Sequence, residues 1–455
     1  MSVQSEIERL NAAKTSLAAA IEGKGVEVPD EAGLDDYAAL VDKIKTGGGN
    51  VLSPQEVYAT QRPAEWVPLP TPGENEMVFL YLIPSTGTST IQIAPYLYDA
   101  SNTARMTILL GNMVGDTLVQ VDSIVYPTTS SGGVTSISLS PDDFSSVTSD
   151  GQKQAVIWVK VDAPCTGFNF FPRASNATLN VVDIRLNLPY IKQTFGFTGY
   201  DSADSALAKL QFISIEGERK ASTPFDLGQG FMHCTGLKAI LSLPDNIGNL
   251  YRAFYNCTSL IAIPELKCNT SAVLDFQEAC RFCYRLQSFS ASQVIKVSSI
   301  SYSFHDCRSI RFVRNLDTSE AKLLSGAFWN CFCLEEIPEL DTSSATTMYG
   351  MCYGARALKK LTTLDMTNVT NVSYITGGTQ CLQKVLFDPT NMWTAPLSIT
   401  MQNMSLPVDA IVDMLSSLPA ISSAQTLNIS GNAWNSMLTD ADKAIATQKG
   451  WTLSV

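Results

Sequence analysis

The side chains best suited to catalysis or metal binding are the cysteines and the two histidines, His233 and His305. His233 directly precedes Cys234, and a neighbouring base and thiol could act as a nucleophilic pair. Cys280 and Cys283 have the Cys-x-x-Cys spacing of zinc and redox sites. A zinc site needs two further ligands, which no second Cys pair with this spacing supplies nearby. We therefore expect these residues to pack in a core, with no metal and no cofactor.

Paired carboxylates give no better catalytic signal. Asp142-Asp143 and Glu335-Glu336 are adjacent in sequence, so on a strand their side chains point to opposite faces and cannot flank one bond. The sequence also contains no Gly-x-Ser-x-Gly, no phosphate-binding Gly-x-x-x-x-Gly-Lys and no His-Glu-x-x-His. Nothing in these patterns indicates an enzyme, and we predict that the protein is not one.

Most of the cysteines belong to a repeat, Phe-x-x-Cys-x-x-Leu, that recurs through the second half of the chain. Its third position recurs at steps of 23, 26, 24, 24, 24 and 24 residues, which predicts a solenoid. Stacked units would align the repeated positions as inner ladders. The predicted ladder residues are Phe231, Cys234, Leu237, Phe254, Cys257, Leu260, Cys283, Leu286, Phe304, Cys307, Ile310, Phe328, Cys331, Leu334, Leu358 and Leu382.

Each unit predicts a short helix through Phe-x-x-Cys, followed by a strand that begins at the Leu. Residues 201–390 are thus expected to form an α/β leucine-rich-repeat solenoid. Residues 391–455 would cap its end. The cap is predicted to contain helices at Pro407–Leu418 and Thr439–Lys449 and strands at Thr426–Ser430 and Trp451–Val455.

Residues 1–46 predict an α-helical module. Apolar residues at Val3, Ile7, Leu10, Leu17 and Ile21 follow heptad spacing. Two readings remain open: a helical hairpin that packs on itself, or a short coil that oligomerises the chain, most simply as a homotrimer. Residues 47–50, rich in Gly, are expected to be a flexible linker.

Residues 51–200 predict an antiparallel β-sandwich, because short segments rich in Val, Ile and Thr alternate with turn-forming residues. The expected strands are Met77–Ile83, Thr90–Leu97, Met106–Leu110, Thr117–Tyr126, Val134–Leu139, Ala155–Val161 and Leu179–Leu186.

Composition excludes several partners. Lys and Arg number 31 against 43 Asp and Glu, a net charge of −12, so the surface should repel nucleic acid and anionic lipid. The longest apolar stretch, Met77–Pro84, is shorter than the roughly 18 residues of a membrane span. The N-terminus has no basic region followed by an apolar core, so we expect no secretory signal and synthesis in the cytoplasm.

A column of large side chains suggests recognition. It consists of the residue after each first repeat position: Met232, Tyr255, Arg281, His305, Trp329 and Tyr353. Aromatic and Arg side chains bind proteins and sugars at low entropic cost. The alternative is that this column contacts only the adjacent turn or a neighbouring subunit.

The predicted β-sandwich offers a second candidate surface. Trp66, Tyr96, Tyr98 and Phe168–Phe171 could form a glycan platform, or be core residues.

The repeat is clearest in Phe254-Tyr-Asn-Cys-Thr-Ser-Leu260, in Phe328-Trp-Asn-Cys331 and in the following Ile337–Ser343, and it resembles the BspA-like leucine-rich repeats of bacterial surface proteins and phage structural proteins. Residues 7–44 resemble the amino-terminal module of phage tail-fibre and minor virion proteins. Arg62–Pro70 is similar to the lead-in to their β-domains, and Leu438–Asp440 with Lys449–Thr452 resembles their closing segment.

The resemblance implies a bacteriophage tail or head fibre protein, which is assembled in the host cytoplasm and displayed on the virion. Residues 1–46 would attach it to other virion proteins, and the solenoid would bind a host cell-surface glycan or protein. Tyr255, Arg281, His305, Trp329 and Tyr353 are the candidate receptor-binding residues. Two alternatives remain: a bacterial BspA-like surface adhesin, and a structural or decorating virion protein without a receptor.

Overall fold

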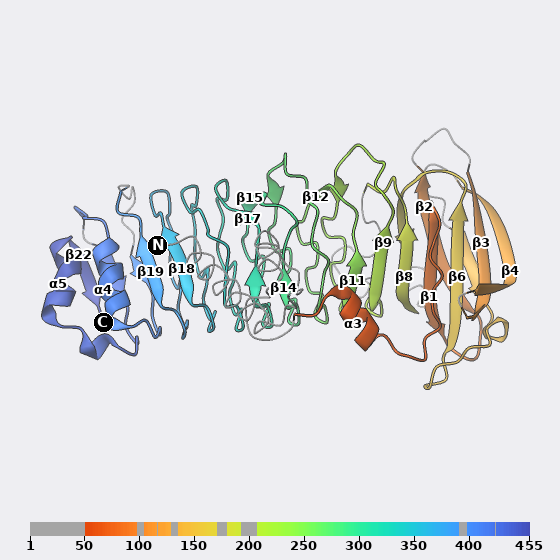
Figure 1. Cartoon of the computed structure of the whole chain (residues 1–455), viewed down its shortest axis with the longest axis horizontal. Coiled ribbons are helices and arrows are strands. Elements are labelled where there is room, and N and C mark those ends of the chain that lie inside the picture. Colours follow the sequence, from red (N-terminus) through yellow and green to blue (C-terminus); the bar gives the residue numbers. More distant parts are fainter. Residues whose placement is uncertain are drawn as a thin grey trace, which may run out of the picture. The chain divides into compact units, whose positions relative to one another are not determined.

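The computed structural model describes residues 51–97, 104–115, 117–128, 135–170, 180–192, 207–390, 398–423 and 425–455 (Figure 1). Residues 52–455 form one compact unit. The predicted helical module at 1–46 and the linker at 47–50 lie outside the described residues.

Two β-sheets form the first part of this unit. Strands of the larger sheet pair antiparallel in the order β8-β1-β6-β3-β4. They are β1 (Glu76–Ile83), β3 (Ala104–Val114), β4 (Thr117–Thr128), β6 (Lys153–Val161) and β8 (Val181–Asn187). The smaller sheet, β5-β2-β7, contains β2 (Ser89–Leu97), β5 (Thr135–Leu139) and β7 (Cys165–Phe170), and a 3-10 helix, η1 (Pro141–Asp143), follows β5.

The two faces of the larger sheet are buried differently. Met77, Phe79 and Tyr81 alternate along β1 and share a core with Ile91 and Ile137 of the smaller sheet. The intervening residues of β1 contribute to a second core on the opposite face. Because both faces of β1 are covered, the strand is apolar from Met77 to Ile83 rather than alternating.

Helix α3 (Pro54–Gln61) covers this opposite face. It begins at Ser53, whose side chain accepts a hydrogen bond from the Glu56 backbone N–H, while the Glu56 carboxylate accepts one from Ser53 N–H. This capping box was present in the sequence as Ser-x-x-Glu, but the helix was not predicted. Val57 of α3 packs with Trp66 and Phe212 in the second core.

The larger sheet continues into the repeat region. β8 pairs in parallel with β9 (Phe212–Glu216), and β9 pairs in parallel with β11 (Ala239–Ser242). The seven strands thus have the order β11-β9-β8-β1-β6-β3-β4. The first coil of the solenoid is thereby hydrogen-bonded to the edge of the β-domain (Figure 1).

The C-terminal region is a β-solenoid of about 10 coils joined by short parallel strands and isolated bridges. The strands are β10 (Phe225–Asp226), β12 (Ile247–Asn249), β13 (Leu274–Asp275), β14 (Ser288–Phe289), β15 (Ile295–Ser299), β16 (Phe312–Val313), β17 (Leu316–Asp317), β18 (Lys360–Leu364) and β19 (Lys384–Phe387).

The prediction of a helix in every repeat was wrong, and with it the α/β description of the solenoid. Across residues 207–390 the Phe-x-x-Cys segments are successive turns. In each, two residues four positions apart have positive φ, as in Asn256 (φ 60°) and Arg252 (φ 52°). A residue in the left-handed region interrupts a right-handed helix, so the segment turns without completing one.

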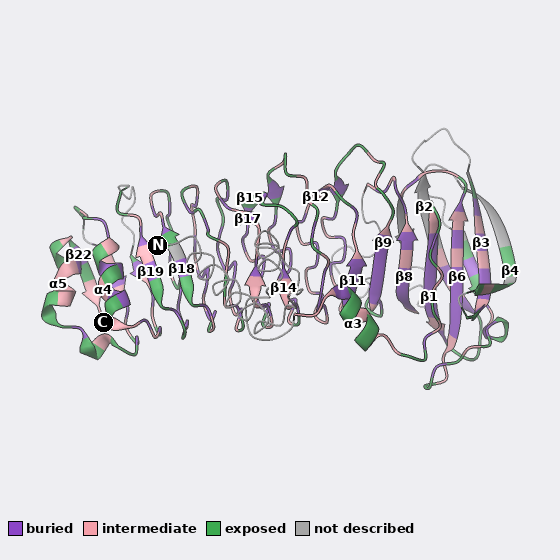
Figure 2. Cartoon of the chain, in the orientation of Figure 1, coloured by how far each residue is buried: buried purple, intermediate pink, exposed green. Residues whose placement is uncertain are grey.

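The repeated apolar residues belong to the hydrophobic core, and every predicted ladder residue is buried. Figure 2 shows buried segments recurring along the solenoid. Phe231 and Phe254 stack with ring centroids 5.9 Å apart, and Phe304 and Phe328 stack at 5.7 Å. The Cys thiols lie beside backbone carbonyls of the preceding coil; Cys257 Sγ, for example, donates to Phe231 O at 2.9 Å.

The C-terminal segment has the predicted helices and strands. They are α4 (Val408–Ser417), β21 (Gln425–Asn428), α5 (Asp440–Gln448) and β22 (Trp451–Ser454), with β20 (Ile399–Thr400) and the 3-10 helix η4 (Asn435–Met437) in addition. β20, β21 and β22 form a parallel sheet. Trp451 is buried, and its indole N–H donates to Pro419 O at 2.9 Å. None of the helices described here has the length and hydrophobicity that a membrane crossing requires.

Candidate functional site: an aromatic ridge on the solenoid

Backbone hydrogen bonds between coils hold the turn residues in register. Asn256 N–H donates to Arg281 O at 2.8 Å, and Asp306 N–H donates to Trp329 O at 2.7 Å. Each of these N–H donors directly follows a residue of the predicted binding column, Tyr255 or His305. The hydrogen bonds therefore place the column residue of each coil beside the column residue of the next coil. The sequence repeat is thereby converted into a row of neighbouring side chains.

This row is a continuous series of ring contacts, which we call the aromatic ridge. Successive coils contribute one or two rings each, and centroids of neighbouring rings lie 4.7–6.1 Å apart. The members of the aromatic ridge are His233, Tyr255, Phe282, Tyr302, His305, Trp329, Tyr349, Tyr353 and Tyr374.

Trp329 is at the centre of the densest part of the aromatic ridge. Its ring stacks on His305 at 5.7 Å and lies 4.7 Å from the ring of Tyr353. Gly350, with φ 58°, makes this packing possible, because a Cβ there would lie only 2.3 Å from the Trp329 ring. A side chain at position 350 would therefore both strain the backbone and displace the indole.

Paired charges lie beside Tyr255, Phe282 and Tyr302 of the aromatic ridge. The carboxylate of Glu278 is almost buried and forms ion pairs with Arg252 and Arg281. The Arg281 guanidinium also lies over the rings of Phe282, at 4.7 Å, and Tyr302, at 5.0 Å. Arg281 is thus held by one carboxylate and by two rings, which fixes its position.

His305 contacts a carboxylate of its own turn and two aromatic rings. Its Nδ1 lies 2.9 Å from the Asp306 carboxylate, while its ring is packed between Phe282 and Trp329. Burial lowers the pKa of His305 below its usual value, and this effect outweighs the opposing effect of Asp306. Burial, with the nearby Arg252, also lowers the pKa of His233. Both imidazoles are therefore neutral at pH 7.

Neither the His233–Cys234 pair nor the Cys280-x-x-Cys283 segment forms a reactive or metal-binding site among the described residues. Burial raises the pKa of Cys234 to about 12, so the thiol beside His233 is held protonated. Cys280 and Cys283 are fully buried and follow the interior of one coil. In the part of the chain that the structure describes, His, Cys, Asp and Glu side chains nowhere gather as three or more potential metal ligands.

The aromatic ridge presents hydrogen-bonding groups as well as apolar surface. Its tyrosine hydroxyls and the Trp329 indole N–H form no hydrogen bond with any other described residue. Tyr374 is 43% exposed, and the other members are partly buried by one another. Half-buried rings with free polar atoms are suited to bind a partner that combines apolar and hydroxyl or amide groups.

The column and the aromatic ridge overlap without being identical. Tyr255, His305, Trp329 and Tyr353 are members of the aromatic ridge, and Arg281 lies against its rings. Met232 is buried and takes no part in a ring contact of the aromatic ridge. The residues that the column missed stand elsewhere in the repeat unit: His233 and Phe282 one position after the column, and Tyr302, Tyr349 and Tyr374 at the left-handed turn or its neighbour.

The β-domain candidates are resolved in part. Trp66 is buried in the second core, so it is a packing residue and is not available as a glycan platform. Tyr98 and Phe171 lie outside the described residues, and the structure describes only the backbone at Tyr96 and Phe168–Phe170.

Comparison with known proteins bears on the solenoid. Residues 248–388 and 298–414 match the family described as Mycoplasma protein of unknown function, DUF285. These segments include most of the aromatic ridge, from Tyr255 to Tyr374. No curated protein matches the chain. The solenoid therefore contains a repeat domain of the DUF285, BspA-like type.

Proposed function

We propose that the protein is a bacteriophage virion fibre protein, of tail or head, that binds the host cell surface through its solenoid. The observation that carries the proposal is the aromatic ridge, which extends across successive coils and whose tyrosine hydroxyls and indole N–H have no hydrogen-bond partner among the described residues. A repeat domain of the DUF285, BspA-like type is compatible with a protein that acts at a surface. The role is binding, without catalysis.

The remaining parts of the chain have supporting roles in this proposal. Residues 1–46 would attach the protein to other virion proteins or oligomerise it, as their resemblance to phage fibre modules suggests. Several displayed copies would multiply weak contacts, because the second contact is effectively intramolecular.

The first test is the binding of purified, fluorescently labelled protein to a panel of Gram-positive and Gram-negative bacteria by flow cytometry. We expect binding to at least one strain, and about 30-fold weaker binding after Trp329→Ala with Tyr353→Ala, since each hot-spot side chain contributes more than about 1 kcal/mol. The matched control is Phe312→Ala. Phe312 is a partly buried aromatic residue of β16 that makes no ring contact with the aromatic ridge.

Two outcomes would contradict the proposal. Equal binding of the double variant and wild type, with both melting at similar temperatures, would remove the aromatic ridge from recognition. Equal loss of binding in Phe312→Ala, with its melting temperature unchanged, would show that the loss is not specific to the aromatic ridge.

The main alternative is a bacterial surface adhesin with the same repeats, which the DUF285 match also suits. An antiserum against the purified protein separates the two: we expect it to label virions released from the source organism, whereas an adhesin would label intact cells. A decorating virion protein without a receptor would label virions but would not bind cells.

A further inference from the structure

A local departure from the repeat period creates a pocket distinct from the aromatic ridge. Leu237 and Leu260 are separated by 23 residues, but Leu260 and Leu286 by 26, against 24 in the following units. A shorter coil therefore stacks against a longer one. Backbone hydrogen bonds still join the short and the long coil: Asn269 N–H donates to Ile247 O at 2.8 Å. The extra residues of the long coil follow Asn269.

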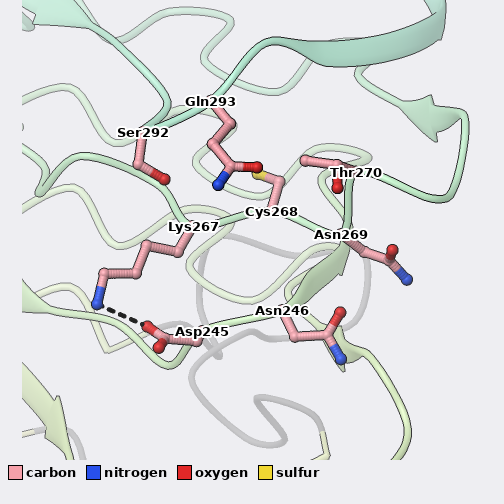
Figure 3. A pocket seen from close by; sticks show the side chains of 8 residues that line it. All are labelled: Asp245, Asn246, Lys267, Cys268, Asn269, Thr270, Ser292 and Gln293. Carbon is pink, nitrogen blue, oxygen red and sulfur yellow. Dashed lines mark ion pairs between the residues drawn. The ribbon is translucent and has the colours of Figure 1, made fainter.

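The pocket at this mismatch has a volume of about 290 Å³, and three successive coils contribute to it (Figure 3). Its lining is almost entirely polar: Asp245 and Asn246 from the short coil, Lys267, Cys268, Asn269 and Thr270 from the long coil, and Ser292 and Gln293 from the next. Ligand pockets measure about 300–1,000 Å³, so this one has the size for a single small molecule or one unit of a polymer.

The charges in the pocket cancel. Lys267 Nζ lies 3.0 Å from Asp245 Oδ1, drawn as a dashed line in Figure 3, and these two are the only charged side chains among the described residues that line the pocket. A cation would need several unpaired carboxylates, and an anion would need an unpaired ammonium or guanidinium group. The lining therefore favours a ligand without net charge.

The neutral side chains supply both donors and acceptors. The side chains of Asn246, Thr270 and Gln293 form no hydrogen bond with another described residue. Asn269 Oδ1 accepts from Ser271 N–H at 3.0 Å, which orients its amide and leaves the Nδ2 donor available. Carboxamides and hydroxyls that can both donate and accept match the hydroxyl groups of a sugar.

We propose that this pocket binds one neutral monosaccharide unit, at a site separate from the aromatic ridge. Binding uses hydrogen bonds from three carboxamides and Thr270, without an aromatic platform. A single small polar site of this kind binds weakly, and its effect depends on several copies of the protein engaging one surface. The site would thus add a second, sugar-specific contact to a surface-binding protein.

The test is saturation-transfer NMR of the full chain with methyl α-D-glucopyranoside, methyl α-D-galactopyranoside and N-acetylglucosamine. Asn246 has φ 59°, so Asn246→Gly removes the amide at a position whose backbone suits glycine. Asn269→Asp keeps the acceptor for Ser271 N–H but removes the donor. We expect transfer to at least one sugar, and about tenfold weaker binding in each variant.

The matched control is Asn403→Gly, since Asn403 is an exposed asparagine with φ 58° that is not part of the pocket lining. We expect its sugar binding to equal that of wild type. The proposal is overturned if none of the three sugars receives saturation, if Asn246→Gly and Asn269→Asp bind as wild type does, or if inorganic phosphate competes for the site.

The aromatic ridge is tested separately by Trp329→Ala with Tyr353→Ala. That variant should retain binding of the monosaccharide. Loss of cell binding together with intact sugar binding, or the reverse, assigns each effect to its own site.

Discussion

Cysteine suits the second repeat position because it is small, apolar and still able to donate a hydrogen bond. Cys283 Sγ donates to Phe254 O, Cys307 Sγ to Cys280 O and Cys331 Sγ to Phe304 O, each at 3.0 Å. The thiols therefore join successive coils in the interior. Two later units have Ala355 and Thr379 at this position, and both residues are also buried, so the position requires a small side chain more strictly than it requires sulfur.

The two histidines make stability depend on pH. Their pKa values in the folded state lie below the ordinary value of 6.5, so the unfolded chain binds protons more readily. The stability that neutral His233 and His305 provide is complete above about pH 6.5 and is lost as the pH falls toward their folded pKa values. We expect a lower free energy of unfolding at about pH 5.5 than at about pH 7.5.

Urea denaturation at both pH values measures this difference. The variant carrying His233→Asn and His305→Gln should show a smaller loss, because Asn and Gln do not titrate. Asn also tolerates the left-handed backbone of position 233, where φ is 64°. An equal loss of stability in wild type and variant would attribute the pH dependence to other groups.

At the scale of the element, the coil is defined by its two left-handed residues. They recur as Arg252 and Asn256, Tyr302 and Asp306, and Gly350 and Gly354. Asn, Asp and Gly accept this conformation readily, whereas other side chains are strained there. Residues such as Tyr302 remain in it because the surrounding hydrogen bonds and ring contacts hold them.

Asn330, with φ 57°, provides a test of this geometry. We expect Asn330→Val to lower the free energy of unfolding by about 1–2 kcal/mol more than Asn330→Gly, because a β-branched side chain is strained in the left-handed region. Both substitutions remove the hydrogen bond from Asn330 Nδ2 to Asp306. The difference between their free energies of unfolding therefore reports the cost of backbone strain at position 330. Chemical denaturation measures it, and equal losses would show that strain at this turn is unimportant.

An ion-pair row accompanies the turns on the strand side of the coil. Glu335 pairs with Arg311 of the preceding coil at 2.6 Å and with Lys359 of the following coil at 3.0 Å. Hydrogen bonds from Arg311 and Lys359 lower the pKa of Glu335. The row joins three successive coils at equivalent positions, as the interior thiols do.

At the scale of the whole molecule, the β-domain closes one end of the solenoid. The parallel pairing of β8 with β9 satisfies the backbone groups at the start of the repeat region, which would otherwise be an open edge. The parallel sheet of β20, β21 and β22 continues the stack at the other end, where α5 packs against β22 and α4 packs against β19 and α5.

Assembly is the remaining property at this scale. We predict that light scattering after size exclusion gives a trimer for the full chain and a monomer for a variant that lacks residues 1–46, because their heptad spacing suits a coiled coil. A monomer in both cases would contradict an oligomerising coil and favour the helical hairpin. A trimer in both cases would locate the subunit contacts in residues 47–455.

The sequence by itself determined the repeat period, the buried ladder positions, the strands Met77–Ile83 and Ala155–Val161 and the helices and strands after residue 407. Local pattern suffices there, because periodic burial is readable along the chain. Only the tertiary structure decided the rest: turns replaced the expected helices, Trp66 became a core residue, and Phe282 and Tyr374 joined the aromatic ridge. The turns and the ridge depend on backbone bonds and ring contacts between coils about 24 residues apart, and the burial of Trp66 depends on its packing against Phe212, far away in sequence; no local pattern encodes such contacts.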